Sequence, residues 1–150
     1  MVIGRRENMG EKRCEEHCLC REMEQLLDEQ QRLAFEGFRF VCEKIGYDTI
    51  PFVLSNGKCA FEVFGRTKKG LFFTTQVFRL ENLDTRHCCA TLSLLLPVDM
   101  DGHPVEFCND VFSLVKTDNC IMVDLTCFCS IKPLSPKLVN RELPIIEPKC

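Results

Sequence analysis

The spacing of apolar residues changes at Thr49, and this change limits the folds open to the chain. Before Thr49, apolar residues recur every three, four or seven positions, which is typical of one face of an α-helix. After it, they alternate with polar residues, which is typical of half-buried strands. The helical stripe comprises Leu19, Met23, Leu26, Leu27, Leu33, Ala34, Phe38, Val41 and Ile45. We expect a long N-terminal amphipathic helix followed by a β domain.

Short β segments follow the helix, with no helical period between them. They read PFVL, CAFEVFG, LFFTTQVFRLENL, HCCATLSLLLPV, DVFSLVK and CIMVDLTCFCSI. Turn-forming stretches such as SNGK, TKKG, LDTR, DMDGHP and KTDN separate them. The Asn-Gly pair in SNGK predicts a hairpin between the first two segments. The order favours an antiparallel β-sandwich or barrel-like domain of about six or more strands.

These patterns divide the chain into four parts within one domain. They are a flexible amino terminus at 1–12, a helix at 13–46, an antiparallel β domain at 47–132 and a proline-rich, extended C-terminal arm at 133–150. Gly46 suits the end of the helix. The apolar stripe is long enough either to pack on the sheet or to form a seam between subunits, and both interpretations stay open.

Charge and hydropathy exclude several classes of partner. The formal net charge of −3 argues against nucleic acid. The longest apolar run, LSLLLPV, is shorter than the roughly 20 residues that cross a bilayer. The amino terminus lacks the apolar core of a secretory signal. We therefore expect a protein made in the cytosol, with no nucleic-acid, membrane or small-molecule partner.

Twelve cysteines in 150 residues are dense for a compartment that keeps thiols reduced. Structural zinc sites usually contain Cys-x-x-Cys, which this chain lacks. The segment CEEHCLC offers Cys14, His17, Cys18 and Cys20, but at a spacing that matches no zinc module. His87 and other histidines stand in no recognisable catalytic context. We expect no enzyme activity, no metal and no cofactor.

Alternation along the strands assigns the thiols to faces. Cys89 and Cys120 point to the side opposite the apolar residues of their segments. The predicted core-side cysteines are Cys59, Cys88, Cys127 and Cys129. These inward thiols are either buried as small hydrophobic groups or bonded to a facing strand, and both alternatives stay open.

Other thiols have no place in a core. Cys14 and Cys18 fall away from the apolar stripe of the helix, and Cys150 ends the proline-rich arm. The candidates for disulfides between subunits are Cys14, Cys18, Cys20, Cys89 and Cys150. Such a pattern suits a building block that is cross-linked after assembly.

One block of the sequence also resembles a known family. The chain contains, in this order, PFVLSNGKCAFEVFG, VFRLENL, CCATLSLLLPV and CIMVDLTCFCSIKPLSP. Across roughly residues 50–140, these segments resemble the CotY/CotZ/ExsY family of cysteine-rich bacterial spore coat proteins. The resemblance places Cys120, Cys127 and Cys129 in the family block, and Cys88 or Cys89 at its mid-chain cysteine.

The resemblance implies a structural protein of the outer spore coat, the crust or exosporium. It implies assembly with itself, as hexamers and two-dimensional lattices reinforced by disulfides, and with other spore coat proteins. Synthesis in the mother-cell cytoplasm, without a signal peptide, would precede deposition on the spore surface and oxidation as that cell lyses. From the residues alone, a cysteine-rich zinc-binding or thiol redox protein of the cytosol is the alternative.

Overall fold

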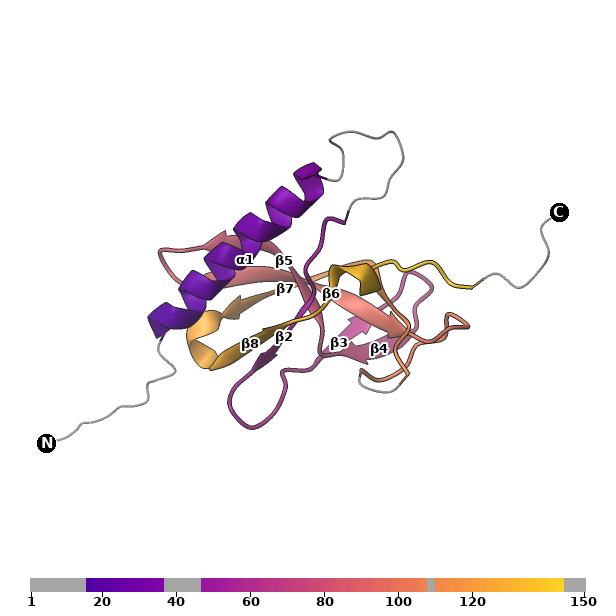
Figure 1. Cartoon of the computed structure of the whole chain (residues 1–150). Coiled ribbons are helices and arrows are strands. Elements are labelled where there is room, and N and C mark those ends of the chain that lie inside the picture. Colours follow the sequence, from indigo (N-terminus) through magenta and orange to yellow (C-terminus); the bar gives the residue numbers. More distant parts are fainter. Residues whose placement is uncertain (1–15, 37–46, 108–109, 145–150) are drawn as a thin grey trace, which may run out of the picture.

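The computed structural model describes residues 16–36, 47–107 and 110–144, which form one helix, seven strands and two short 3-10 helices (Figure 1). The elements are α1 (Glu16–Glu36), β2 (Phe52–Ser55), β3 (Val63–Arg66), β4 (Phe72–Thr75), β5 (Phe78–Asp84), β6 (Cys89–Val98), β7 (Ser113–Asp124), η2 (Leu125–Cys127), β8 (Ser130–Pro133) and η3 (Pro136–Leu138).

The strands form a large sheet in the order β7-β6-β5-β2-β8 and a separate two-stranded sheet of β3 and β4. Every strand pairing is antiparallel. Figure 1 shows α1 lying along one side of the large sheet, with β3 and β4 toward the opposite end of the molecule. The predicted class, mainly β and antiparallel with an N-terminal helix, is confirmed. The large sheet is open, with β7 and β8 at its edges, so it is not a closed barrel.

The apolar stripe of α1 packs on the large sheet. Leu19, Met23 and Leu26 are buried in the main core, beside side chains of β2, β5 and β6. This burial confirms the first of the two interpretations of the stripe. Phe38, Val41, Ile45 and the predicted helix stop at Gly46 lie outside the described residues.

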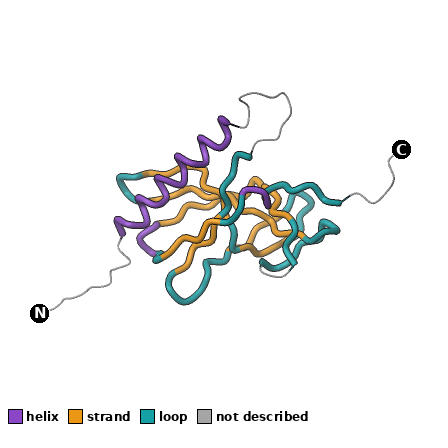
Figure 2. Tube along the Cα trace, viewed as in Figure 1, coloured by secondary structure: helices purple, strands orange, loops and turns teal. Residues whose placement is uncertain are grey.

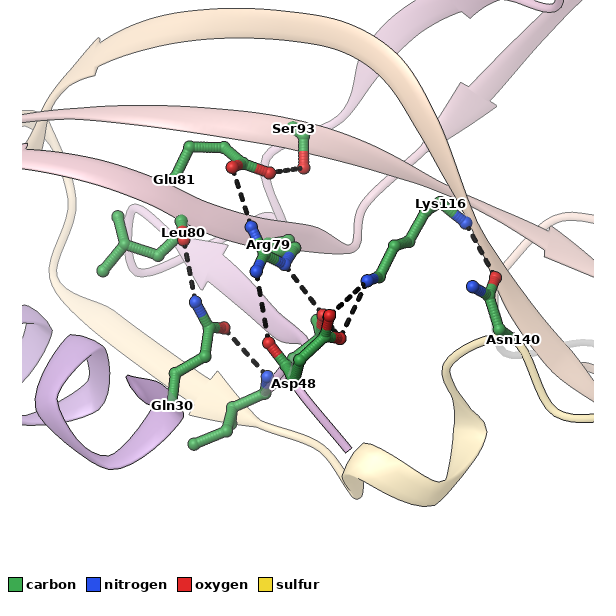
Figure 3. Close-up of polar contacts among 10 residues, drawn as sticks. Gln30, Asp48, Arg79, Leu80, Glu81, Ser93, Lys116 and Asn140 are labelled. Atoms are coloured by element: carbon green, nitrogen blue, oxygen red, sulfur yellow. Dashed lines mark hydrogen bonds and ion pairs between the residues drawn. The ribbon is translucent and has the colours of Figure 1, made fainter. Parts of the chain in front are cut away.

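A buried glutamine fixes the helix in place (Figure 3). Gln30 lies among the buried residues of α1, and its Nε2 donates to the Leu80 carbonyl of β5 at 2.9 Å. Its Oε1 accepts from the Ile50 backbone N–H, also at 2.9 Å. Burying an amide is favourable only when its hydrogen bonds are made. Gln30 therefore ties the helix both to the sheet and to the segment before β2.

Replacing Gln30 with methionine should destabilise the protein by about 2–4 kcal/mol, because two backbone groups lose their partner in a buried place. Gln31→Met is the matched control, since Gln31 is exposed one position along, and it should change stability by less than about 0.5 kcal/mol. Urea unfolding in reductant measures both. Equal stabilities of the two variants would contradict this role for Gln30.

The two faces of β6 pack in two different cores. The pairing of β6 with β7 shifts between Ser93 and Leu95, where residues 117–119 of β7 lie opposite Leu94. Alternation along β6 itself continues, so Leu92 and Leu94 are buried in the main core and the adjacent Leu95 is buried in a second cluster on the other face. The second cluster contains Val77, Leu95 and Leu114.

The first part of the proline-rich arm packs on this second cluster. Leu134, Leu138 and Val139 contact it, and the Asn140 N–H donates to the Leu114 carbonyl at 2.7 Å. The arm was predicted to be simply extended, but these residues form a short 3-10 helix, η3, that covers the core. Apolar residues between the prolines supply the contacts.

The predicted turn at KTDN is wrong. Residues 116–119 lie within the continuous strand β7, at the register shift. The Thr117 hydroxyl donates to the Leu94 carbonyl at 2.7 Å, and the Asn119 side chain bonds both backbone groups of Arg66 at 3.1 and 2.9 Å. Side chains that satisfy backbone groups allow a bulge where the local sequence indicates a turn.

The predicted hairpin between PFVL and CAFEVFG is also wrong beyond its turn. Gly57 has a φ of +104°, as an Asn-Gly turn needs, but only one bridge follows, between Ser55 and Ala60. β2 pairs instead with β5 and β8, while β3 pairs with β4. Both edges of β2 are occupied, so the next segment finds another partner.

A polar network covers the side of the sheet where residues 48 and 49 cross it (Figure 3). Arg79 pairs with Glu81 at 2.7 Å and donates to the Thr49 hydroxyl at 2.8 Å. Lys116 pairs with Asp48 at 2.8 Å. Burial alone would raise the pKa of the Asp48 carboxyl, but hydrogen bonds from Lys116 and Thr49 outweigh it and lower that pKa. The pKa of Glu81 is lowered in the same way by Ser93 and Arg79.

Because the folded-state pKa of Asp48 is depressed, its contribution to stability is present above the unfolded pKa, near 4, and is lost as pH falls through the lower folded value. The Lys116→Met variant should lose at most about 1 kcal/mol at pH 7, since the pair is half-exposed. Its free energy of unfolding should also fall less between pH 5 and pH 2. Urea unfolding across that range tests this. A fall as large as that of the wild type would contradict it.

Candidate functional site

The structure places the predicted thiols at several separate positions. Cys59, Cys120 and Cys127 are free and exposed, and Cys20, Cys88 and Cys89 are half-buried. Cys129 is exposed and takes part in a disulfide. Cys14 and Cys150 lie outside the described residues, and Cys18 lies in α1 with its side chain outside them.

The inward orientation predicted for Cys59, Cys127 and Cys129 is wrong, since all three are exposed. The last predicted strand ends at Asp124, whose carboxylate accepts from the Thr126 N–H and hydroxyl at 3.0 and 2.7 Å and so begins η2. In this 3-10 turn the strand alternation no longer holds. The buried places are taken by Leu125 and Phe128.

Cys59 is exposed for a different reason. It closes the turn after β2, where its backbone N–H donates to the Asn56 side chain at 3.2 Å. A thiol in a turn is not subject to the alternation of a strand. The adjacent loop residues are exposed as well, so Cys59 projects from the end of the sheet.

Cys20 of α1 and Cys88 meet where the helix crosses the start of β6. The two thiols are hydrogen-bonded. Cys88 packs against the main core, as predicted, but from a turn and not from a strand, because its φ is +54°. Its carbonyl accepts from the Leu125 N–H at 2.9 Å. Burial, followed by the Cys20 hydrogen bond and the Asp124 charge, raises the pKa of Cys88 to about 12.

Cys89 lies between two carboxylates. In the strand register it pairs with Asp84 on β5 and with Asp124 on β7. Partial burial, then the charges of Asp124 and Asp84, raise the pKa of the Cys89 thiol. Asp84 is itself held by the His87 ring at 2.9 Å. Nucleophilic cysteines need electropositive surroundings that favour the thiolate, and these surroundings favour the protonated thiol.

Cys120 lies on the outer face of β7. It pairs with Ser93 in the register and, with Met122 and Asp124, points away from the main core, as the alternation predicted. Cys59, Cys120 and Cys127 therefore present free thiols from a turn, a strand and a 3-10 helix. We define these three as the exposed thiols.

Within the described ranges, one group of side chains has the spacing of a metal site. It consists of Asp99, Asp101 and His103 in the β6–β7 loop, with ligand atoms within 4.8 Å of one another. The Asp99 carboxylate accepts from the backbone N–H groups of both other residues at 2.9 Å. These bonds account for the loop geometry, and the sequence reasoning did not single out this group.

Among the described residues, no helix is long and apolar enough to cross a membrane. Together, the fold and the outward thiols define a cysteine-rich, antiparallel β protein. Residues 5–136 match the family described as spore coat protein Z. The chain is also 42% identical over 103 residues to spore coat protein Z of Bacillus subtilis (strain 168), covering 63% of this chain and 68% of that protein. No solved structure matches it.

The chain therefore belongs to the spore coat protein Z family, which confirms the family resemblance seen in the sequence. Membership makes it a protein of sporulation and of the spore coat, deposited on the spore surface.

The thiols should differ in reactivity in the reduced protein. At pH 8 a thiol whose pKa is about 12, such as Cys88, is about one part in ten thousand thiolate. Cys59 and Cys120 are exposed, so iodoacetamide should label them at least about tenfold faster, as followed by mass spectrometry. In 8 M urea the rates should converge. Equal rates in the native protein would contradict the structural environment of Cys88.

Proposed function

We propose that this protein is a structural, self-assembling component of the outer spore coat, in the crust or exosporium, and not an enzyme. Its subunits form hexamers and two-dimensional lattices that disulfides then reinforce. The observation that carries this proposal is the display of Cys59, Cys120 and Cys127 as free, exposed thiols on separate elements. Thiols in such places are available to neighbouring subunits.

The composition of the core supports a separation between the residues that stabilise the fold and the cysteines that cross-link subunits. The fully buried side chains are aliphatic or aromatic, apart from a few polar ones. Burial of apolar surface stabilises a domain without cross-links. Cys59, Cys120 and Cys127 can therefore remain reduced while the subunit folds and assembles, and form bonds when conditions become oxidising. Cys14, Cys18, Cys20, Cys89 and Cys150 remain further candidates for such bonds.

The alternative of a zinc-binding or thiol redox protein has less support. Zinc ligation and thiol exchange both require the thiolate. Burial and nearby carboxylates raise the pKa values of Cys88 and Cys89, which opposes its formation. The proposed partners are therefore further copies of the chain and other spore coat proteins, and the proposed route is synthesis in the mother-cell cytoplasm before deposition.

Removing the exposed thiols should separate cross-linking from assembly. Purified wild-type protein should form regular particles or sheets by electron microscopy, and covalent ladders on non-reducing gels after oxidation. A variant with Cys59, Cys120 and Cys127 changed to serine should retain the particles and lose at least half of the ladder. A Cys20→Ser variant is the single-site comparison at a half-buried thiol.

A concentrated wild-type protein that stays monomeric and binds stoichiometric zinc would overturn the proposed function. A full ladder from the triple variant would instead show that the remaining cysteines form the cross-links.

A further inference from the structure

The hairpin of β3 and β4 carries an exposed apolar patch. Phe64, Leu71 and Phe72 are 77%, 61% and 74% exposed. In the register, Phe64 pairs with Thr74 and Arg66 with Phe72, which puts both rings on one face. Gly65 and Phe73 point the other way, into the main core. Exposed aromatic groups of this kind usually mark a contact with another molecule.

Cations surround this patch. Arg66 lies with its guanidinium carbon 5.3 Å from the centre of the Phe72 ring. Lys68 and Lys69 follow in the turn between the strands and are exposed. We name the whole surface the basic aromatic tip. Its members are Phe64, Arg66, Lys68, Lys69, Leu71 and Phe72.

The tip is held in a fixed conformation before any partner binds. Asn119 of β7 bonds both backbone groups of Arg66, in the manner of a neighbouring strand. In the turn, the Thr67 hydroxyl accepts from the Leu71 N–H at 3.1 Å. A preformed surface loses little conformational entropy on binding, which favours association.

A matching surface of opposite charge lies on α1. Glu22 and Glu29 are exposed and seven residues apart, so they lie on one line along the helix. This acidic stripe runs along the exposed side of the helix, beside the buried stripe of Leu19, Met23 and the residues that follow. Across the described residues, no ion pair engages these glutamates; the one within α1 joins Asp28 and Arg32.

We propose that the basic aromatic tip of one copy docks on the acidic stripe of α1 in a second copy. This inference rests on the proposed self-assembly and names the surfaces that perform it. Figures 1 and 2 show α1 and the hairpin at opposite ends of one molecule, so the two surfaces of a single chain do not meet. Two tips repel each other because both are cationic. The contact is therefore heterologous, head to tail.

The dimensions agree with such a contact. Glutamates seven positions apart on a helix are about 10 Å apart along its axis. The three cations at positions 66, 68 and 69 lie on a hairpin end of similar size, so they can reach two carboxylates at once. The aromatic rings then cover the helix beside them. A heterologous contact repeats from copy to copy, closing as a ring or extending as an array.

Paired charge reversals test the contact. Lys68→Glu/Lys69→Glu and, separately, Glu22→Lys/Glu29→Lys should each raise the concentration for half-assembly at least tenfold, by light scattering and sedimentation in reductant. A chain with all four changes should return to within threefold of the wild type, because the charges again match. Lys132→Glu/Lys137→Glu, at exposed lysines elsewhere, is the matched control and should assemble normally. Circular dichroism checks the fold of each variant.

The outcomes separate the two proposals. A wild-type protein that does not assemble overturns both the proposed function and this contact. Assembly that tolerates either reversal overturns the contact alone. So does a folded four-fold variant that assembles no better than its parents.

Discussion

The burial of both faces of β6 is the constraint on which the rest of the fold depends. Alternation sends Leu92 and Leu94 into the cluster under α1, and Leu95 into the cluster under the C-terminal residues. The pairing with β7 shifts between Ser93 and Leu95, where residues 117–119 of β7 lie opposite Leu94. This bulge in β7 positions Asn119 against β3. Strand β6 and its bulged partner thus join the helix, both sheets and the arm.

Apart from Cys88, which packs against the main core, this construction leaves the described cysteines outside the two apolar clusters. Leu125 and Phe128 are buried in the main core beside η2. Cys127 lies between them in the sequence and Cys129 directly follows Phe128, and both cysteines are exposed. Where Cys20 and Cys88 meet, burial and the contact with Cys20 raise the pKa of the Cys88 thiol, which favours its protonated form. A coat protein made of such subunits can separate folding from cross-linking, because the groups that stabilise the fold and the groups that form bonds differ.

Much of the architecture was predictable from local patterns. The helix over Leu19–Leu26, the antiparallel class and the outward position of Cys120 follow from periodicity, because burial on one face imposes a period on the residues. The polar contacts of Gln30 and Asn119 carry no local signal, since their partners are backbone groups far away in the sequence. The predicted hairpin between PFVL and CAFEVFG does not form, because β5 and β8 occupy the two edges of β2.

The sequence by itself determined the class of fold, the family and the abundance of thiols, since composition, period and motif are properties of neighbouring residues. Only the tertiary structure decided which thiols are exposed, where the bulge falls and which surfaces remain uncovered. The exposure of Cys59 and Cys127 follows from the turn after β2 and the 3-10 helix after β7, and that of the aromatic rings of β3 and β4 depends on which distant segment occupies each edge and face. That competition between segments is settled by packing of the whole chain, which no short stretch encodes.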